Sequence, residues 1–261
     1  MTGDPLRGLE PQPTGFGTCG GCPYRDVGAA AVCYPCARQT MRALPKSRCR
    51  VCDQELTAPK EPCSNPVCRW PNRQFGWNAA IAMRGGALEQ AINRYKYDGV
   101  RGWALIFGRV LAGFLYDRRE LFAGFDLVIP SPTYVGPGGR SFDHTALVLA
   151  EAARLDETGL PFALDPPVLV KTGPTRKLVG LSWSARRDVC RDEVPEVLHV
   201  PNPAGVAGQQ ILVYDDVFTD GLNLNAVAKK LREADAAQVC GLRWRGSPGG
   251  PDRPPARSRS C

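Results

Sequence analysis

Two neighbouring carboxylates at the end of an apolar segment carry the clearest chemical signal in this sequence. Residues 211–214 read Ile-Leu-Val-Tyr, Asp215 and Asp216 follow directly, and a short loop with Gly221 leads into a helical pattern. In open α/β sheets, ligands bind at the carboxyl ends of strands, and the free N–H groups at a helix start suit a phosphate. Two adjacent carboxylates can also accept hydrogen bonds from vicinal ribose hydroxyls. The segment therefore predicts a site for a phosphorylated ribose; the alternative is a solvated strand end.

The loop after the two carboxylates would hold the 5′-phosphate of such a ligand. It consists of Thr219, Asp220, Gly221, Leu222 and Asn223. The carboxylate of Asp220 either faces the phosphate and repels it, or points outward and leaves only its N–H in the loop. We expect Asp215 and Asp216 to lie outside the core, so that replacing both with Asn would remove ligand binding without unfolding the protein.

Eight cysteines repeat one metal-binding pattern in the N-terminal part of the chain. They form two consecutive units, and in each unit ten residues separate two closely spaced pairs. Four thiolates arranged in this way surround a tetrahedral zinc ion and leave no open position, which is typical of a structural site. Disulfides and an iron–sulfur cluster are the alternatives. We predict two structural zinc sites, with the pairing within consecutive units or crossed, from Cys19, Cys22, Cys33, Cys36, Cys49, Cys52, Cys63 and Cys68.

Alternating helical and strand patterns supply the elements that must position these residues. Apolar residues recur at helical spacing within 88–95, 103–114, 144–155 and 224–231. Short apolar runs predict strands at 127–129, 168–170, 211–214 and 239–242, with a weaker one at 197–200. Strands that alternate with helices favour an α/β fold, with a parallel sheet of about five strands flanked by helices.

Composition divides the chain into four parts. Residues 1–17 predict a flexible leader, 18–74 a cysteine-rich zinc-ribbon module, 75–245 the α/β domain and 246–261 a disordered basic tail. Because the core pattern begins only after Phe75, we expect a Cys49→Ser change to leave the α/β domain folded.

Charge and apolar patterning limit the class of protein. The formal charge is +7, and two zinc sites with four thiolates each would lower it to roughly +3. Such a mild charge does not by itself indicate a nucleic-acid partner. We recognise neither a signal peptide nor a membrane-spanning segment, and we expect a cytoplasmic protein without membrane contact.

The acidic loop resembles the phosphoribosyl pyrophosphate (PRPP) signature of type I phosphoribosyltransferases, and the chain as a whole is similar to the ComF family. Features of that family occur in order along nearly the full length: the cysteine module, Tyr95-Lys96-Tyr97-Asp98-Gly99, Ile129-Pro130-Ser131-Pro132, Arg140-Ser141-Phe142-Asp143-His144 and Arg186-Arg187. The family loop usually reads Asp-Asp-Val-x-Thr-Thr-Gly-x-Thr, so Asp220 and Asn223 depart from it. The resemblance implies a type I phosphoribosyltransferase fold behind a double zinc ribbon, with residues 78–119 forming a helical hood over the sheet edge.

The resemblance also implies a ligand, a metal and a reaction. PRPP would bind with Mg²⁺, which would bridge the ribose hydroxyls and the pyrophosphate. Asp215 and Asp216 would hold the ribose as the catalytic pair. Ser131 and Thr133 would border the pyrophosphate, and Arg140 with a basic loop would close over it. A nitrogen nucleophile would then displace pyrophosphate, although the sequence does not identify that acceptor.

A second hypothesis treats the chain as a binding protein. ComF-like proteins are associated with DNA uptake in natural competence, so the resemblance also implies a sensor of PRPP or of a nucleotide that acts through partners. Basic and aromatic residues of the cysteine module, such as Arg69 and Trp70, suit single-stranded DNA or a protein of the competence machinery. An ordinary solvated surface is the alternative for these residues.

Overall fold

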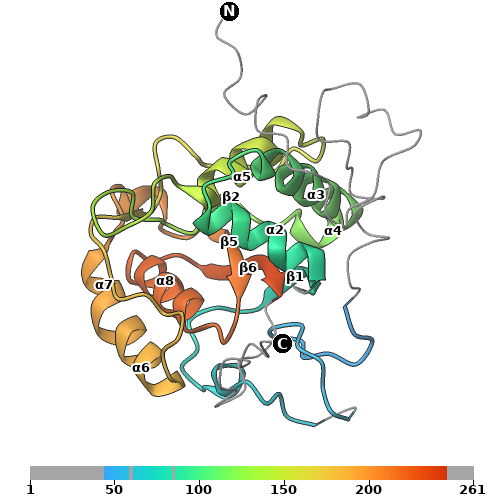
Figure 1. Cartoon of the computed structure of the whole chain (residues 1–261), viewed down its shortest axis with the longest axis vertical. Helices are drawn as coiled ribbons and strands as arrows, with labels where there is room; N and C mark the ends of the chain where they lie inside the picture. Colours follow the sequence, from blue (N-terminus) through green and yellow to red (C-terminus); the bar gives the residue numbers. More distant parts are fainter. Residues whose placement is uncertain (1–43, 59–60, 84–85, 246–261) are drawn as a thin grey trace, which may run out of the picture.

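A parallel four-stranded sheet forms the centre of the molecule (Figure 1). The computed structural model describes residues 44–58, 61–83 and 86–245. Neighbouring strands are parallel, in the order β1-β6-β5-β2. The strands are β1 (Asn78–Met83), β2 (Leu127–Pro130), β5 (Gln210–Phe218) and β6 (Gln238–Arg245). The predicted α/β fold with a parallel sheet is confirmed.

Helices cover both faces of this sheet, as Figure 1 shows. One face carries α2 (Gly86–Tyr97), α3 (Trp103–Asp117), α4 (Arg119–Phe122) and α5 (His144–Arg154). The other face carries α6 (Trp183–Asp188), the π-helix η3 (Val189–Glu193), α7 (Val194–Val197) and α8 (Leu222–Glu233). Two short 3-10 turns, η2 (Pro66–Arg69) and η4 (Pro203–Gly205), lie in the connections.

The apolar residues of β5 divide between the two cores by strict alternation. Leu212 and Tyr214 pack with α2, α3 and α5, whereas Ile211 and Val213 pack with α8. All four side chains are at most 1% exposed. Side chains of a strand alternate between the two faces, so a strand covered on both sides is apolar throughout. This burial anchors β5 between the two layers and so sets the position of Asp215 and Asp216, which follow the apolar residues.

Three strands differ from the sequence-based expectation. Residues 78–83, expected within the helical hood, form β1 instead, and the hood begins only with α2. Three of these residues are alanines, which have little preference for strands, so pairing with β6 decides their structure. The runs near 168–170 and 197–200 reduce to β3 (Val170–Lys171) and β4 (Leu198–His199), which pair antiparallel in a separate small sheet. Within the described residues, the parallel sheet therefore has four strands rather than the expected five.

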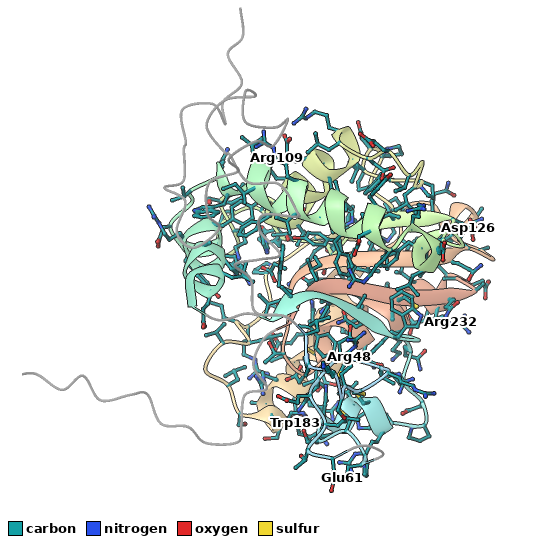
Figure 2. All side chains as sticks on the ribbon, turned by 90° about the vertical axis from the view of Figure 1, so that its right-hand side faces the viewer. Arg48, Glu61, Arg109, Asp126, Trp183 and Arg232 are labelled. Atoms are coloured by element: carbon teal, nitrogen blue, oxygen red, sulfur yellow. The ribbon has the colours of Figure 1, made fainter. Side chains whose placement is uncertain are left out.

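The second cysteine unit packs directly on the α/β core. Figure 2 shows this segment, marked by Arg48 and Glu61, below the sheet on the same side as Trp183. Its buried residues Cys52 and Val67 belong to the same apolar cluster as β5 and α8. The N–H of Asn78 in β1 donates to the carbonyl of Val51 at 2.7 Å. This shared core argues against the expectation that a disrupted Cys49 would leave the α/β part unaffected.

Among the helices of the described residues, none is long and apolar enough to cross a membrane.

Candidate functional site

A bulge interrupts β5 at the two predicted carboxylates, near the carboxyl end of the strand. Tyr214 pairs with Leu242 of β6, and Val217 pairs with Trp244, so Asp215 and Asp216 together oppose a single residue. A bulge of this kind bends a strand and redirects its side chains. Asp215 is 8% exposed and Asp216 is 9% exposed. The expectation that they lie outside the core is therefore wrong.

Asp216 is held by two side chains from the opposite helical layer. Lys96, near the end of α2, forms an ion pair with its Oδ2 atom. Nε2 of His144, the first residue of α5, lies 2.7 Å from the same oxygen. Burial alone would raise the pKa of Asp216, but Lys96 and His144 outweigh it, and the pKa lies well below its ordinary value. Asp216 is thus an ionised carboxylate in a nearly closed setting.

Asp215 is held from the other side of the strand by Arg243. Nη1 of Arg243 lies 3.2 Å from Oδ2 of Asp215, and Asn223 donates its Nδ2 hydrogen to the same oxygen at 3.1 Å. Arg243 is only 1% exposed, and burial lowers its pKa. Its Nε and Nη2 atoms have no hydrogen-bond partner among the described residues. The guanidinium therefore retains donors beside the acidic pair.

The predicted phosphate loop forms a left-handed turn into α8. Gly221 precedes α8 with φ of 85°, a conformation that glycine adopts without strain. Asp220 turns its carboxylate toward the start of the helix: the N–H of Leu222 donates to its Oδ1 atom at 3.0 Å. Its Oδ2 atom pairs with Nε of Arg186 in α6 at 3.2 Å. The Asp220 carboxylate is therefore directed to the helix start and to Arg186.

The turn after β2 lies next to the acidic pair. The N–H of Ser131 donates to the carbonyl of Tyr214 at 2.7 Å, and the Thr145 hydroxyl donates to the carbonyl of Ser131 at 2.7 Å. The hydroxyl of Thr133 lies 3.4 Å from Nδ1 of His144. This turn and Asp216 therefore share His144 as a neighbour.

Arg140 braces the residue that pairs with Asp216. Its Nη1 atom donates to the backbone carbonyl of Lys96 at 3.0 Å, and its guanidinium lies 4.8 Å from the ring centre of Tyr97. All the predicted ribose, phosphate and pyrophosphate residues thus gather around the carboxyl ends of β2 and β5.

Four of the eight predicted zinc ligands converge on one point. The sulfur atoms of Cys49, Cys52, Cys63 and Cys68 all lie within 4.8 Å of one another. The Cys52 and Cys63 sulfurs are 3.8 Å apart, which is about the sulfur–sulfur spacing around a tetrahedral zinc with bonds of ~2.3 Å. These thiols fit a structural zinc ion. The two cysteine pairs that meet belong to one consecutive unit, so the pairing is within a unit and not crossed. Cys19, Cys22, Cys33 and Cys36 lie outside the described residues.

Several residues of the site carried a weaker signal or none in the sequence. Lys96 and His144 belong to the ComF-like motifs, but neither was assigned a role. Arg243 was missed, although a charged residue between Leu242 and Trp244 in an apolar strand is the kind of exception that marks a buried ion pair. Arg186 belongs to the basic stretch that was expected to close over the pyrophosphate, and in the structure it pairs with Asp220 of the phosphate loop.

Comparisons with known proteins reveal only distant relationships. No family model and no curated protein matches the chain. The solved structures that it resembles include the allosteric regulatory enzyme of purine biosynthesis, at 21% identity and a TM-score of 0.36. The glutamine PRPP amidotransferase of B. subtilis, complexed with ADP and GMP, matches at 21% identity and a TM-score of 0.37. In both cases the match covers 59% of this chain and only 30% of the other.

A third solved structure of this kind is a hypoxanthine phosphoribosyltransferase of Staphylococcus aureus. It matches at 9% identity and a TM-score of 0.33, over 56% of this chain and 73% of that one. At such TM-scores the likeness carries no argument about the site, which rests on the geometry described above.

Proposed function

We propose that this protein binds PRPP together with Mg²⁺ at the carboxyl edge of β2 and β5. The observation that carries the proposal is the convergence of three parts at this edge: the acidic pair, the left-handed turn at Gly221 into α8, and the Ser131 to Thr133 turn. Each part matches one group of PRPP, namely the ribose, the 5′-phosphate and the pyrophosphate. A parallel sheet brings such loops together at the ends of its strands.

The proposed roles follow from these positions. Asp215 and Asp216 would accept hydrogen bonds from the ribose hydroxyls, and residues 219–223 would hold the 5′-phosphate with backbone N–H groups. Ser131 and Thr133 would border the pyrophosphate, with Arg140 behind them. Arg186 would help to neutralise the phosphate, because it already pairs with the carboxylate of Asp220.

The acidic pair also fits the magnesium ion that accompanies such ligands. Mg²⁺ prefers oxygen ligands and often binds through one or two carboxylates plus substrate phosphates. Asp215 and Asp216 offer such oxygens. When bound, the ion would neutralise the charge on the departing pyrophosphate.

Transfer of the phosphoribosyl group would complete the proposed activity. The bond between C1 of the ribose and the pyrophosphate oxygen would break, with its electron pair leaving on the pyrophosphate. A nitrogen nucleophile would form the new bond to C1 and then lose a proton. Positive charge would develop at C1 after the old bond weakens and before the new bond is complete, and the nearby carboxylates would stabilise this charge.

Binding without turnover is the second candidate, and Asp220 favours it. Its carboxylate takes the N–H of Leu222 that a phosphate would otherwise use. A ligand would have to displace this internal anion, which weakens binding and hinders a fully assembled catalytic site. A sensor of PRPP or of a nucleotide requires only binding, so this reading fits the present geometry.

A cavity separate from the acidic pair favours a partner role for the surface around Trp70. It has a volume of about 270 Å³ and lies between the cysteine segment, η3 and α8, with Trp70, Arg187, Arg191 and Lys229 in its lining. Each of these three cations forms an ion pair with a neighbouring carboxylate, namely Asp188, Asp192 and Glu233, which single-stranded DNA or an acidic segment of a competence protein would replace. Binding of single-stranded DNA should weaken steeply with salt and on Trp70→Ala; salt-independent binding, or none at low salt, would contradict this role.

Calorimetric titration with PRPP tests the main proposal. The wild type should bind PRPP only with Mg²⁺ present. Asp220→Thr should bind about tenfold more tightly, because it removes an anion that competes with the phosphate. Asp220→Asn is the matched control, since it keeps an acceptor for the Leu222 N–H and removes only the charge.

A parallel assay for pyrophosphate released in the presence of purine and pyrimidine bases separates the two candidates. Release would support phosphoribosyl transfer, whereas binding without release would support the sensor. If neither the wild type nor the variants bind PRPP, the proposal is wrong.

A further inference from the structure

The second cysteine unit touches the phosphate loop through one side chain. Asn65, which lies between Cys63 and Cys68, donates its Nδ2 hydrogen to the backbone carbonyl of Asp220 at 2.9 Å. The two residues are 155 positions apart in the chain. Asn65 is only 6% exposed, and the hydrogen bond itself is partly buried. A metal-binding segment and a candidate ligand-binding loop therefore share a partly buried hydrogen bond.

The other polar groups of Asn65 are used within the cysteine unit. Its N–H donates to the sulfur of Cys63 at 3.4 Å, and its carbonyl accepts the N–H of Cys68 at 3.2 Å. Its side-chain oxygen accepts the N–H of Val67 at 3.1 Å. The position of Asn65 is thus set by the sulfur of Cys63 and by the backbone N–H of Cys68, and its Nδ2 group donates out of the unit to Asp220.

Asp220 is the residue of the phosphate loop on which this bond would act. Its carbonyl group belongs to the peptide that joins it to Gly221, the residue with the left-handed turn. Its carboxylate holds both the N–H of Leu222 and the guanidinium of Arg186. A shift of this peptide would therefore move the start of α8 and the N–H groups that it presents.

We propose that Asn65 is a positioning residue that couples zinc occupancy to the geometry of the phosphate loop. With zinc bound, Cys63 and Cys68 are fixed as ligands and hold Asn65 in place through the Cys63 sulfur and the Cys68 N–H, and Asn65 holds the Asp220 peptide. Without zinc, the thiols are no longer drawn to one point, Asn65 loses its fixed position, and the loop loosens. The effect on ligand affinity rests on the proposed PRPP binding, whereas the effect on the loop does not.

A second hydrogen bond, between the end of the cysteine-rich module and α8, offers a control. The N–H of Gln74 donates to the side-chain oxygen of Asn225 at 2.9 Å. Asn225 lies one turn into α8, beyond the phosphate loop. Asn225→Ala therefore removes a contact between the cysteine segment and α8 without touching Asp220.

The test compares Asn65→Asp with the wild type and with Asn225→Ala, all loaded with zinc. Asp keeps the acceptor for Val67 and nearly the same shape, but it cannot donate to Asp220. Hydrogen exchange of the amides at 221–223 should become faster in Asn65→Asp and in zinc-depleted wild type, but not in Asn225→Ala. Affinity for PRPP with Mg²⁺ should fall between about threefold and tenfold in Asn65→Asp, as expected for one lost hydrogen bond.

Zinc content and unfolding temperature are measured on every variant. If Asn65→Asp loses zinc or fails to fold, Asn65→Ser replaces it, because a serine hydroxyl still caps Val67 but is too short to reach Asp220. Wild-type exchange rates in a variant that retains zinc would overturn the coupling. Absence of PRPP binding in the wild type would contradict the proposed function alone, since the exchange measurement still decides the role of Asn65.

Discussion

At the scale of single residues, the site is built from buried charges that already have partners. Asp216 lies between Lys96 and His144, and Asp215 lies against Arg243. Isolated buried charges are costly, and paired ones are tolerated only with good geometry. A ligand at this edge would therefore bind to a network whose shape is set before it arrives, which favours a pre-organised site.

The first prediction concerns the stability that Asp216 contributes. Asp216→Asn leaves Lys96 and His144 without their counter-charge, so the free energy of unfolding should fall by roughly 3–5 kcal/mol. Urea unfolding measures this change. Asp98→Asn, an exposed carboxylate in the same segment, should stay within about 0.5 kcal/mol of the wild type. An equal effect of both changes would contradict the buried network.

The lowered pKa of Asp216 gives the same network a defined pH dependence. A carboxyl whose pKa is lower in the folded state contributes stability that is fully present above its unfolded pKa, near ~3.9. This contribution is lost as the pH falls from there through the folded pKa. The wild type should lose stability more steeply than Asp216→Asn in that acidic range, as urea unfolding at several pH values would show. Parallel curves would mean that Asp216 does not titrate differently on folding.

At the scale of elements, β5 and α8 act as one unit joined by the phosphate loop. The bulge at Asp215 and Asp216 orients the acidic pair, and five residues after Asp216, Gly221 turns the chain into the helix. A side chain at Gly221 would meet the ring of Phe218, with its Cβ 2.8 Å from the nearest ring carbon. The end of the strand therefore packs against the start of the helix, and this contact leaves no room for a side chain at position 221.

The second prediction follows from that close approach. Gly221→Ala should lower the unfolding temperature, because a left-handed non-glycine residue costs ~1–2 kcal/mol and the contact with Phe218 adds to it. PRPP binding should weaken as the helix start shifts. Thermal unfolding and calorimetry measure the two effects.

Two other glycines separate the causes of this effect. Gly159 has a left-handed backbone, with φ of 74°, and open space where a Cβ would lie. Gly124 has the same open space without a left-handed backbone. We expect Gly159→Ala to show only the backbone cost and Gly124→Ala to show none. A Gly221→Ala protein as stable as Gly124→Ala would disprove the tight packing of the loop.

At the scale of the whole molecule, the second cysteine unit and the α/β domain are joined by packing and hydrogen bonds. They share an apolar cluster, a backbone hydrogen bond from Asn78 to Val51, and the bond from Asn65 to Asp220. Domains that share a core unfold together, whereas those joined by a linker unfold separately. The boundary between residues 74 and 75 remains a prediction, and the shared contacts lead us to expect that the parts on its two sides unfold together.

The third prediction concerns zinc. Elemental analysis of the full chain should give two zinc ions, one of them held by the four described cysteines. Chelation, or Cys49→Ser, should lower the unfolding temperature of the entire α/β domain, because the bound metal contributes to the free energy of folding. Circular dichroism and tryptophan fluorescence should follow one common transition. A separate transition for the α/β domain, unchanged by chelation, would restore the earlier expectation of independence.

Local signals in the sequence were enough to predict the main elements and one cluster of four cysteines. The helical spacing at 88–95 and 224–231, the apolar run at 211–214 and the repeated cysteine pairs all depend on neighbours within a few positions. The corresponding elements α2, α8 and β5 and the second cysteine cluster are present in the structure. These features are readable because period and spacing are properties of the chain itself.

Tertiary structure alone decided which groups meet. His144 lies 72 positions from Asp216, and Asn65 lies 155 positions from Asp220, and no local pattern predicts such contacts. The alanine-rich β1 became a strand through pairing with β6, and Asp220 pairs with Arg186 in another helix. The burial of the acidic pair follows from the layers on both faces of the sheet. Each of these outcomes is a balance of long-range packing and charge, which only the folded arrangement sets.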